Sequence, residues 1–274
     1  MVTSGIVIAG IMPYQAFCEN PLLLTIMLMT YEQDIAIPLR MRTFFGAAFF
    51  ALSEKHDASK GSFERRMKTG LTVTRFVDYF SEFCARTYCD GIYEMDGIQI
   101  YTYFNAMHEK AKDPDTITAA DFTTDIVENL CLMTDHDGVY RFIHRSFQEF
   151  FSVMYFVKAD DKCLNAIGMF FDNRKEYSDS DVTFNLLYDL IPERIERNVF
   201  IPFLEDLFCK CVEEEGLQTF MKRTKESFLL KFLIEKENLT GSAPEEQYQR
   251  LAIYLEEIKS KTKTPGEDLF ALFA

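Results

Sequence analysis

The run Leu130-Cys-Leu-Met-Thr134 is followed by Asp135-His-Asp-Gly138 and then by a second apolar run, Val139-Tyr-Arg-Phe-Ile143. An Asp-Gly pair between two apolar runs is a strong local signal for a β-hairpin. Beyond the hairpin, from about Ser146, apolar residues recur at the spacing of one wide helical stripe. They are Phe147, Phe150, Phe151, Met154 and Tyr155. The stretch predicts a hairpin that leads into a helix with a buried aromatic face. Gln148 and Glu149 are expected on the polar side of that helix.

Helical patterns also precede the hairpin. Apolar residues at helical spacing predict an amphipathic helix from about Ser62 to Tyr88. Residues 89–100 contain two turn signals, Asp90-Gly91 and Asp96-Gly97, and a weaker helix is predicted near residues 101–111. A capping-box-like start at Thr118 predicts a helix through about Asn129. Two helices, a hairpin and a following helix stand in the order of a winged helix.

The flanking sequence is helical on both sides. Asn20 and Pro21 open a helix near the N-terminus, because Asn is a good N-cap and Pro suits the first helical position. From Asp160 onward the pattern is helical throughout. We therefore expect an all-α, multi-helical fold with a winged-helix subdomain that carries one small β-hairpin. The expected domains are a helical domain over residues 1–60, a winged-helix domain over 61–160 and a C-terminal helical domain over 161–274.

Composition excludes several classes of function. The 274 residues include 29 Lys and Arg against 43 Asp and Glu, which gives a net charge of −14. Direct binding to nucleic acid depends on basic residues that neutralise phosphates, so this balance argues against it. The seven cysteines form no CxxC pair and are expected to be reduced and packed as small hydrophobes. We expect a cytoplasmic protein that does not bind a membrane, because no secretory signal is visible and the longest apolar run is too short to span a bilayer.

No self-contained active site is visible. The sequence has no G-x-x-x-x-G-K-[ST] phosphate loop, no G-x-S-x-G, no H-E-x-x-H and only four histidines, which are far apart. Asp135, His136 and Asp137 could suggest a metal, but three ligands in one turn point in diverging directions. We interpret them as a solvated hairpin tip and expect no metal in this chain. The chain is not expected to hydrolyse ATP by itself.

Two segments resemble one family of regulated ATPases. The stretch Phe142-Ile-His-Arg-Ser-Phe-Gln-Glu-Phe-Phe151 resembles the winged-helix signature of the NACHT-family STAND NTPases, which include the NOD-like receptors and bacterial defence proteins. The stretch Asn20-Pro-Leu-Leu-Leu-Thr25, with Ile37-Pro38 and His56-Asp57 after it, resembles the helical domain that follows the NACHT nucleotide-binding core. Together the two signatures cover roughly residues 18–157. The remainder corresponds by position to the second helical domain of such proteins.

The resemblance implies two contacts with nucleotide. In that family the Pro of the first signature lies near the adenine, and the His of the second contacts the β-phosphate of ADP in the closed state. Carried over, these residues are Pro21 and His144. Arg145 would add charge nearby, but its role is not fixed by the resemblance. Because the family's P-loop and acidic Mg²⁺ residues are missing, ADP or ATP would bind only together with a NACHT core, in cis or in trans. The chain would be a fragment, a truncated reading frame or a product that works with a separate core.

Two classes of function remain open. The first is a regulatory module that clamps ADP against a NACHT core and transmits nucleotide exchange to oligomerisation in antiphage defence or innate immune signalling. The second is a free-standing α-helical interaction protein without nucleotide control, which would bind partners through its acidic surface and Phe-rich grooves. Association with a P-loop protein would separate the two.

Overall fold

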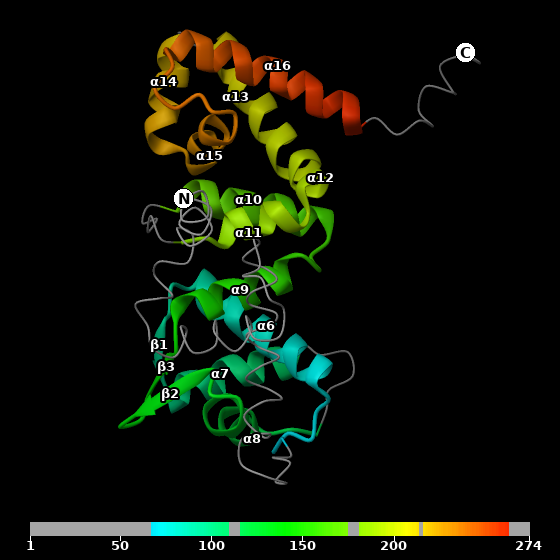
Figure 1. The fold of residues 1–274 in the computed structure, drawn as a ribbon, viewed down its shortest axis with the longest axis vertical. Coiled ribbons are helices and arrows are strands. Elements are labelled where there is room, and N and C mark those ends of the chain that lie inside the picture. The colour runs from blue at the N-terminus through cyan, green and yellow to red at the C-terminus, as the bar shows by residue number, and fades with distance from the viewer. Residues whose placement is uncertain (1–66, 110–115, 175–180, 214–215, 263–274) are drawn as a thin grey trace, which may run out of the picture. The chain divides into compact units, whose positions relative to one another are not determined.

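The computed structural model describes residues 67–109, 116–174, 181–213 and 216–262. These residues are mostly helical and include one small antiparallel sheet, as Figure 1 shows, so the predicted all-α class with a small hairpin is confirmed. The chain divides into two compact units between Tyr155 and Phe156. The expected helical domain over residues 1–60 lies outside the described residues, and the three-domain division stays a prediction.

The first unit follows the predicted order, with one additional strand. From residue 67 onward, where this unit is described, its elements are α6 (Val73–Cys89), β1 (Glu94–Asp96), α7 (Gly97–His108), α8 (Ala119–Thr124), the π-helix η3 (Asp125–Asn129), β2 (Met133–His136), β3 (Val139–Phe142) and α9 (Arg145–Phe156). The helix expected from Ser62 is described only from residue 67, and α6 begins at Val73 after a turn at 68–69. The helix expected through Asn129 changes from α to π geometry at Asp125.

The hairpin forms where it was predicted, with a tighter turn. Asp137 and Gly138 both adopt positive φ, 56° and 81°, as a two-residue type I′ turn requires. Asp135 Oδ1 accepts a hydrogen bond from the Gly138 N–H at 2.9 Å. Strands β2 and β3 pair with Thr134 opposite Arg141. The predicted hairpin is therefore confirmed, with Asp135 and His136 belonging to β2 rather than to the turn.

Strand β1 was not predicted. It pairs antiparallel with β3, with Met95 opposite Tyr140, so the sheet order is β1-β3-β2. Of the two turn signals in this stretch, Asp90-Gly91 does lie in a turn, whereas Asp96 ends β1 and Gly97 begins α7, so the second expectation is wrong. Three residues are too few to show the alternation of a strand, and only pairing with the distant β3 defines this one.

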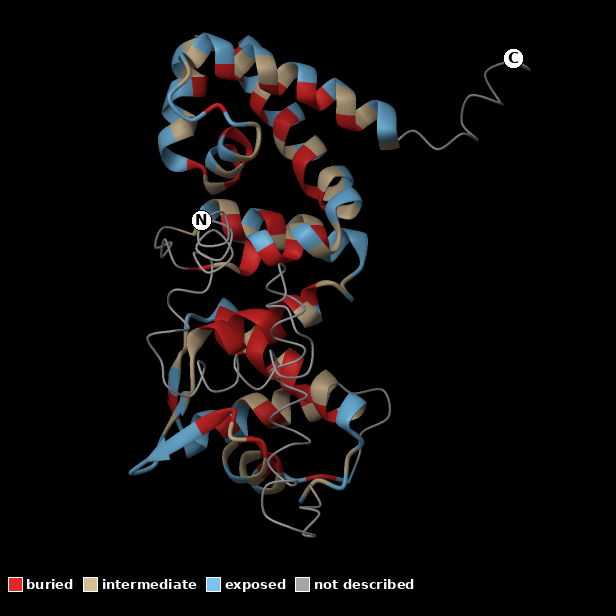
Figure 2. Ribbon diagram, viewed as in Figure 1, coloured by how far each residue is buried: buried red, intermediate tan, exposed pale blue. Residues whose placement is uncertain are grey.

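Phenylalanine rings fill the core of the first unit. Helix α6 contributes Phe76, Phe80 and Phe83, all fully buried. The Phe80 and Phe151 ring centroids are 4.8 Å apart, and those of Phe83 and Phe122 are 5.6 Å apart, both with near edge-to-face geometry. In Figure 2 the buried residues of α6 and α9 lie side by side. The aromatic stripe of α9 therefore packs on α6, as its periodicity predicts.

The predicted faces of α9 are only partly correct. Phe147, Phe150 and Phe151 are buried as expected, whereas Met154 is half-buried and Tyr155 is exposed. Gln148 and Glu149 were expected on a polar face, but they are 0% and 1% exposed. This expectation is wrong because α9 has neighbours on more than one side, and the polar pair finds partners inside the unit.

The second unit is entirely helical where it is described. Its elements are α10 (Asp161–Asn173), α11 (Thr183–Leu190), α12 (Pro192–Ile195), η4 (Glu196–Phe200), α13 (Ile201–Glu213), α14 (Leu217–Glu226), α15 (Phe228–Lys236) and α16 (Pro244–Thr262). Helix α10 approaches η4 closely at Gly168, where an added Cβ would lie 3.0 Å from Val199 Cγ2 and nearer still to Val199 Cγ1. Phe171, Phe184 and Phe200 are fully buried in this unit.

The cysteines are free thiols in the described part of the chain, but they are not uniformly packed inside. Cys84 and Cys211 are buried, Cys131 is intermediate, and Cys89, Cys163 and Cys209 are exposed. The expectation that they pack as small hydrophobes is therefore wrong for the exposed three. Within the same ranges, no helix is long and apolar enough to cross a membrane.

Candidate functional site

His144 lies at the junction between β3 and α9. The N–H of Ser146 donates to His144 Nδ1 at 3.2 Å, and the N–H of Phe147 donates to the His144 carbonyl at 3.1 Å. The ring is half-buried at the start of the helix. Pro21, the other residue implied by the resemblance, lies outside the described residues. The structure therefore places one of the two predicted contact residues.

The local contacts favour one protonation state of the His144 ring. Burial lowers the pKa of His144 from its ordinary value, so the ring is neutral at pH 7. A neutral imidazole whose Nδ1 accepts a hydrogen bond carries its proton on Nε2. His144 is therefore suited to donate from Nε2 to an anionic oxygen. The first turn of α9 adds the positive end of the helix dipole beside it.

Arg145, the next residue, is held by a buried carboxylate. Its Nε lies 2.8 Å from Oε1 of Glu149, one helical turn along α9. Its guanidinium also stacks over the ring of Tyr93, 4.4 Å from the centroid. Removing Arg145 would take this cation away from the buried Glu149 carboxylate, at a cost in stability. The contact with Tyr93 ties the start of α9 to the segment before β1, whereas the ion pair with Glu149 lies within the helix.

Gln148 ties α9 to the far end of α6. Its side-chain amide donates to Thr87 Oγ1 at 2.9 Å and to the carbonyl of Ile92 at 2.8 Å. The Thr87 hydroxyl in turn donates to the carbonyl of Phe83 at 2.9 Å. Gln148 Oε1 accepts no hydrogen bond from the described residues. Gln148 is one turn beyond His144, so these bonds fix the segment of α9 that carries the histidine.

Asp125 anchors the segment that directly precedes α6. This carboxylate is fully buried in η3. It accepts hydrogen bonds from the N–H of Lys68 at 2.7 Å, from the N–H of Thr69 at 3.0 Å and from the Thr69 hydroxyl at 2.7 Å. Asn129 Nδ2 adds a fourth bond. Sequence reasoning missed this residue, because Asp125 stands in an ordinary helical pattern and its partners Lys68 and Thr69 are more than fifty positions away.

The hairpin tip is fully solvated. Asp135, His136 and Asp137 are all exposed. Across the described ranges, no group of three His, Cys, Asp or Glu side chains stands close enough together to hold a metal ion.

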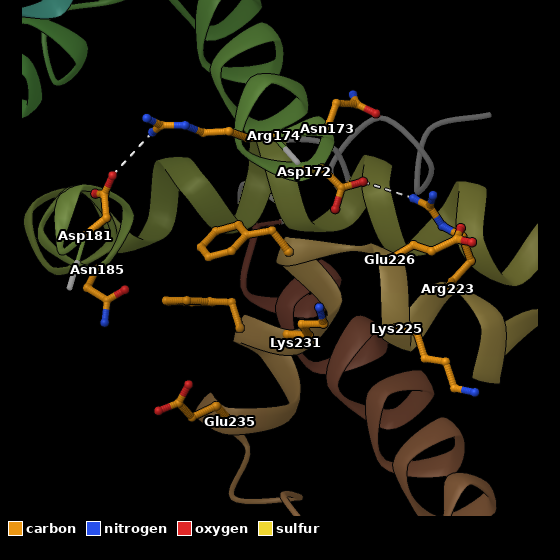
Figure 3. Close-up of a pocket in the computed structure, with 12 residues that line it drawn as sticks. Asp172, Asn173, Arg174, Asp181, Asn185, Arg223, Lys225, Glu226, Lys231 and Glu235 are labelled. Carbon is orange, nitrogen blue, oxygen red and sulfur yellow. Dashed lines mark hydrogen bonds and ion pairs between the residues drawn. The ribbon is translucent and has the colours of Figure 1, made fainter. Parts of the chain in front are cut away.

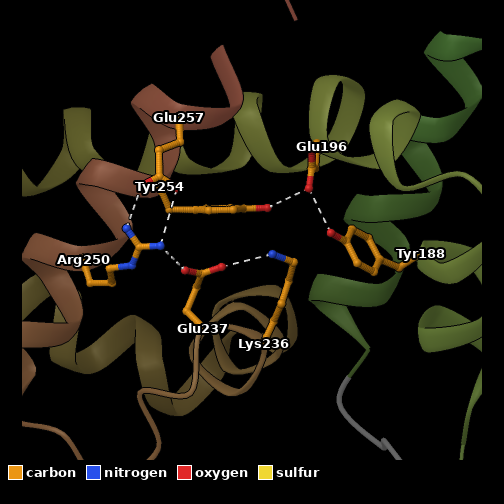
Figure 4. Close-up of polar contacts among 7 residues, drawn as sticks. All are labelled: Tyr188, Glu196, Lys236, Glu237, Arg250, Tyr254 and Glu257. Carbon is orange, nitrogen blue, oxygen red and sulfur yellow. Dashed lines mark hydrogen bonds and ion pairs between the residues drawn. The ribbon is translucent and has the colours of Figure 1, made fainter. Parts of the chain in front are cut away.

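A polar network joins the helices of the second unit (Figure 4). Glu196 Oε1 accepts from the Tyr188 hydroxyl at 2.9 Å and from the Tyr254 hydroxyl at 3.2 Å. Burial and the Glu196 charge raise the pKa of both phenols, so they stay protonated donors. Lys236 lies over the Tyr254 ring, 4.4 Å from its centroid. The network links α11, η4, α15 and α16, so its role is to hold this helical unit together.

An open cavity of about 950 Å³ lies in the same unit (Figure 3). Two of the cations that line it form ion pairs with lining carboxylates. Arg223 pairs with Asp172 at 2.9 Å, and Arg174 pairs with Asp181 at 3.3 Å. Asp172 also accepts from the Leu229 N–H at 3.1 Å, and it thereby occupies the start of α15. Asp172 therefore engages both Arg223 and the Leu229 N–H at this wall of the cavity.

Comparison with known proteins identifies one segment of this unit. Residues 188–231 match the model of a family described as the short NACHT-associated C-terminal domain, family 14. The chain carries a NACHT-associated C-terminal module. No curated protein and no solved structure matches the chain. The match runs from α11 into α15 and lies inside the region expected to be the C-terminal helical domain. It supports the association with a NACHT core that the resemblance implies.

Proposed function

We propose that this chain is the regulatory part of a NACHT ATPase. It would hold ADP against the nucleotide-binding core in the closed state and transmit nucleotide exchange to oligomerisation in defence or immune signalling. The match of residues 188–231 to a NACHT-associated C-terminal module carries the proposal. The core, in cis or in trans, would supply the P-loop and the Mg²⁺ ligands.

The architecture of the first unit supports a winged-helix assignment. Its elements run helix, strand, helix, helix and hairpin, and the first strand pairs with the second strand of the hairpin. This is the arrangement expected of a winged helix. The pairing of Arg141 with Glu94 at 3.0 Å, on the exposed side of the sheet, leaves no simple basic face there for nucleic acid. A regulatory role inside a larger protein fits this surface better than DNA binding.

His144 would be the residue that senses the nucleotide. Its neutral ring can donate to a phosphate oxygen, and the start of α9 favours an anion at the same place. When ADP leaves, this contact is lost, and the balance between closed and open states shifts by the free energy that the contact contributed. Arg145, through Tyr93, and Gln148 hold the helix that presents the ring.

The test is the retention of ADP by the chain when it is bound to its NACHT core. His144→Ala removes the donor, and His136→Ala, at the exposed hairpin tip, is the matched control. Losing one hydrogen bond to a charged group costs about 1.5–3 kcal/mol, which corresponds to roughly 10- to 100-fold weaker retention. ADP content after gel filtration, measured by chromatography of the denatured sample, should fall for His144→Ala alone. Equal ADP content in both variants would remove the proposed role.

A further inference from the structure

The cavity of the second unit is bordered by a basic segment in an acidic chain. Residues 217–236, which span α14 and α15, contain five Lys and Arg against two Glu, although the whole chain has a net charge of −14. Three of these cations, Arg223, Lys225 and Lys231, line the cavity (Figure 3). The cavity lies entirely within the second unit. Its surroundings therefore favour an anion more than the chain as a whole does.

Arg223 is held in position and still has donors to offer. Its Nη2 lies 2.9 Å from Oδ2 of Asp172, whose side chain is only 10% exposed. Asp172 is itself fixed, because its other oxygen accepts from the Ser227 hydroxyl and from the Leu229 N–H. A guanidinium has five N–H donors, and Asp172 is the acceptor that Arg223 reaches among the described residues. Such a preorganised guanidinium is suited to bind an oxyanion through two parallel hydrogen bonds.

The exposed charges of the lining include both signs. Lys231 lines the cavity from the first turn of α15, and it forms no ion pair with another residue that the structure describes. Glu226, on α14 with Arg223, would repel an anion bound there. Glu235 lies at the far end of the site from Arg223, as Figure 3 shows. The cations that could meet an anion are therefore Arg223 and Lys231, with Glu226 as the nearest opposing charge on the same helix.

Aromatic rings and an amide complete the lining. Phe228 and Phe232 are half-buried and lie on the same face of α15 as Lys231. Both pack near edge-to-face on the buried Phe184 ring, with centroids 5.3 Å and 4.9 Å away, so their positions are fixed. Asn185 is exposed on α11, and its amide can donate and accept hydrogen bonds. Aromatic rings beside cations form the kind of surface on which nucleic-acid bases stack.

We propose that this cavity binds a phosphate ester that carries an aromatic base, as a nucleotide does. Arg223 and Lys231 bind the phosphate, and the rings of Phe228 and Phe232 contact the base. The volume of about 950 Å³ lies within the usual range of ligand pockets, about 300–1,000 Å³. Arg223 and Lys231 belong to the segment that matches the NACHT-associated C-terminal module, so the site gives that module a small-molecule ligand of its own.

This site goes beyond the proposed function and does not depend on it. The ADP contact proposed at His144 lies in the first unit and requires a NACHT core, whereas the cavity is built by the second unit alone. The chain can therefore be tested without a core, and neither result bears on the retention of ADP.

The experiment is isothermal titration calorimetry of the full chain. The probes are AMP, GMP and UMP, with inorganic phosphate as the ligand that lacks a base. Stacking of a base on an aromatic ring is worth roughly 5- to 150-fold in affinity, so we expect at least one nucleoside monophosphate to bind about tenfold more tightly than phosphate. If none of the three binds, or if phosphate binds equally well, the inference is overturned.

Variants locate the site. Arg223→Gln and Lys231→Gln should each weaken binding of the nucleotide about tenfold, because each removes a charged donor to the phosphate. Lys222→Gln is the matched control, since Lys222 is an exposed lysine next to Arg223 that does not line the cavity. It should bind as the unsubstituted chain does. If all three variants bind alike, the nucleotide lies elsewhere and the inference is overturned.

Glu226→Gln tests the charge of the ligand. It removes a negative charge beside the phosphate, so binding should become about two- to threefold tighter. Weaker binding would mean that Glu226 holds a cationic or donor group, which contradicts the assigned orientation. Circular dichroism shows whether each variant remains folded. Should Arg223→Gln unfold the unit by leaving Asp172 without its cation, Lys231→Gln and Glu226→Gln decide the question, because both replace exposed side chains.

Discussion

Replacing Gln148 by Glu tests the interior of the first unit most sharply. The side chain is 0% exposed, and both of its recorded bonds are donated, to Thr87 Oγ1 and to the Ile92 carbonyl. In Gln148→Glu an ionised carboxylate would face these two oxygens. Each lost bond costs about 1 kcal/mol, and an uncompensated buried charge costs about 3–5 kcal/mol more. We therefore expect the free energy of unfolding to fall by about 5 kcal/mol at pH 7.5.

The pH dependence of the unfolding free energy shows whether the buried charge causes the loss of stability in Gln148→Glu. Burial disfavours the charged form, so the new carboxyl has a higher pKa in the folded than in the unfolded chain. The loss of unfolding free energy is then largest at neutral pH. It becomes smaller as the pH is lowered towards about 4.3, the pKa of the carboxyl in the unfolded chain.

The assay is urea unfolding at pH 7.5 and pH 5. Gln148→Met, which removes the donors without adding a charge, is the control, and we expect it to lose about 1–2 kcal/mol. A Gln148→Glu variant as stable as the unsubstituted chain at pH 7.5 would mean that this side chain faces water, as the sequence pattern suggested.

Three further predictions concern packing, titration and reactivity. Gly168→Ala should lower the unfolding free energy by about 1–2 kcal/mol, although Ala has the better helix propensity, because the new Cβ overlaps the buried Val199. Urea unfolding measures this loss, and adding Val199→Ala should restore part of it. Burial lowers the folded pKa of His144, so the unfolded chain takes up this proton first, and stability should fall as pH drops below about 6.5. His144→Gln should flatten that slope, and an unchanged slope would contradict the assigned environment. Iodoacetamide should modify exposed Cys89 well before Cys84, whose pKa is raised by full burial; mass spectrometry of timed samples checks the order, and equal rates would refute it.

Local signals predicted the parts of the fold that depend on neighbours in sequence. The Asp137-Gly138 turn needs positive φ at both positions, which Asp tolerates and Gly prefers, so the hairpin was visible in the sequence. The aromatic spacing of α9 likewise identified its buried face. Strand β1 was missed because it consists of three residues and exists through its pairing with β3, more than forty positions away.

The polar interior could not be predicted in the same way. Periodicity assigns polar residues to the solvent side, and it cannot reveal that Thr87 and Ile92 offer oxygens to Gln148. Asp125 and Arg194 are similar cases, since their partners include backbone groups whose positions follow only from the tertiary fold. His144 was found through a family resemblance, and the structure adds the hydrogen bond from Ser146 that sets its donor nitrogen.

The most direct test of the NACHT association is immunoprecipitation from the source cells with an antibody against residues 144–274. We predict that the precipitate contains a P-loop NACHT core, either in a band well above 31.9 kDa that also carries this chain or as a separate protein bound to it. A band at 31.9 kDa with no P-loop protein beside it would contradict the regulatory role and favour a free-standing interaction protein.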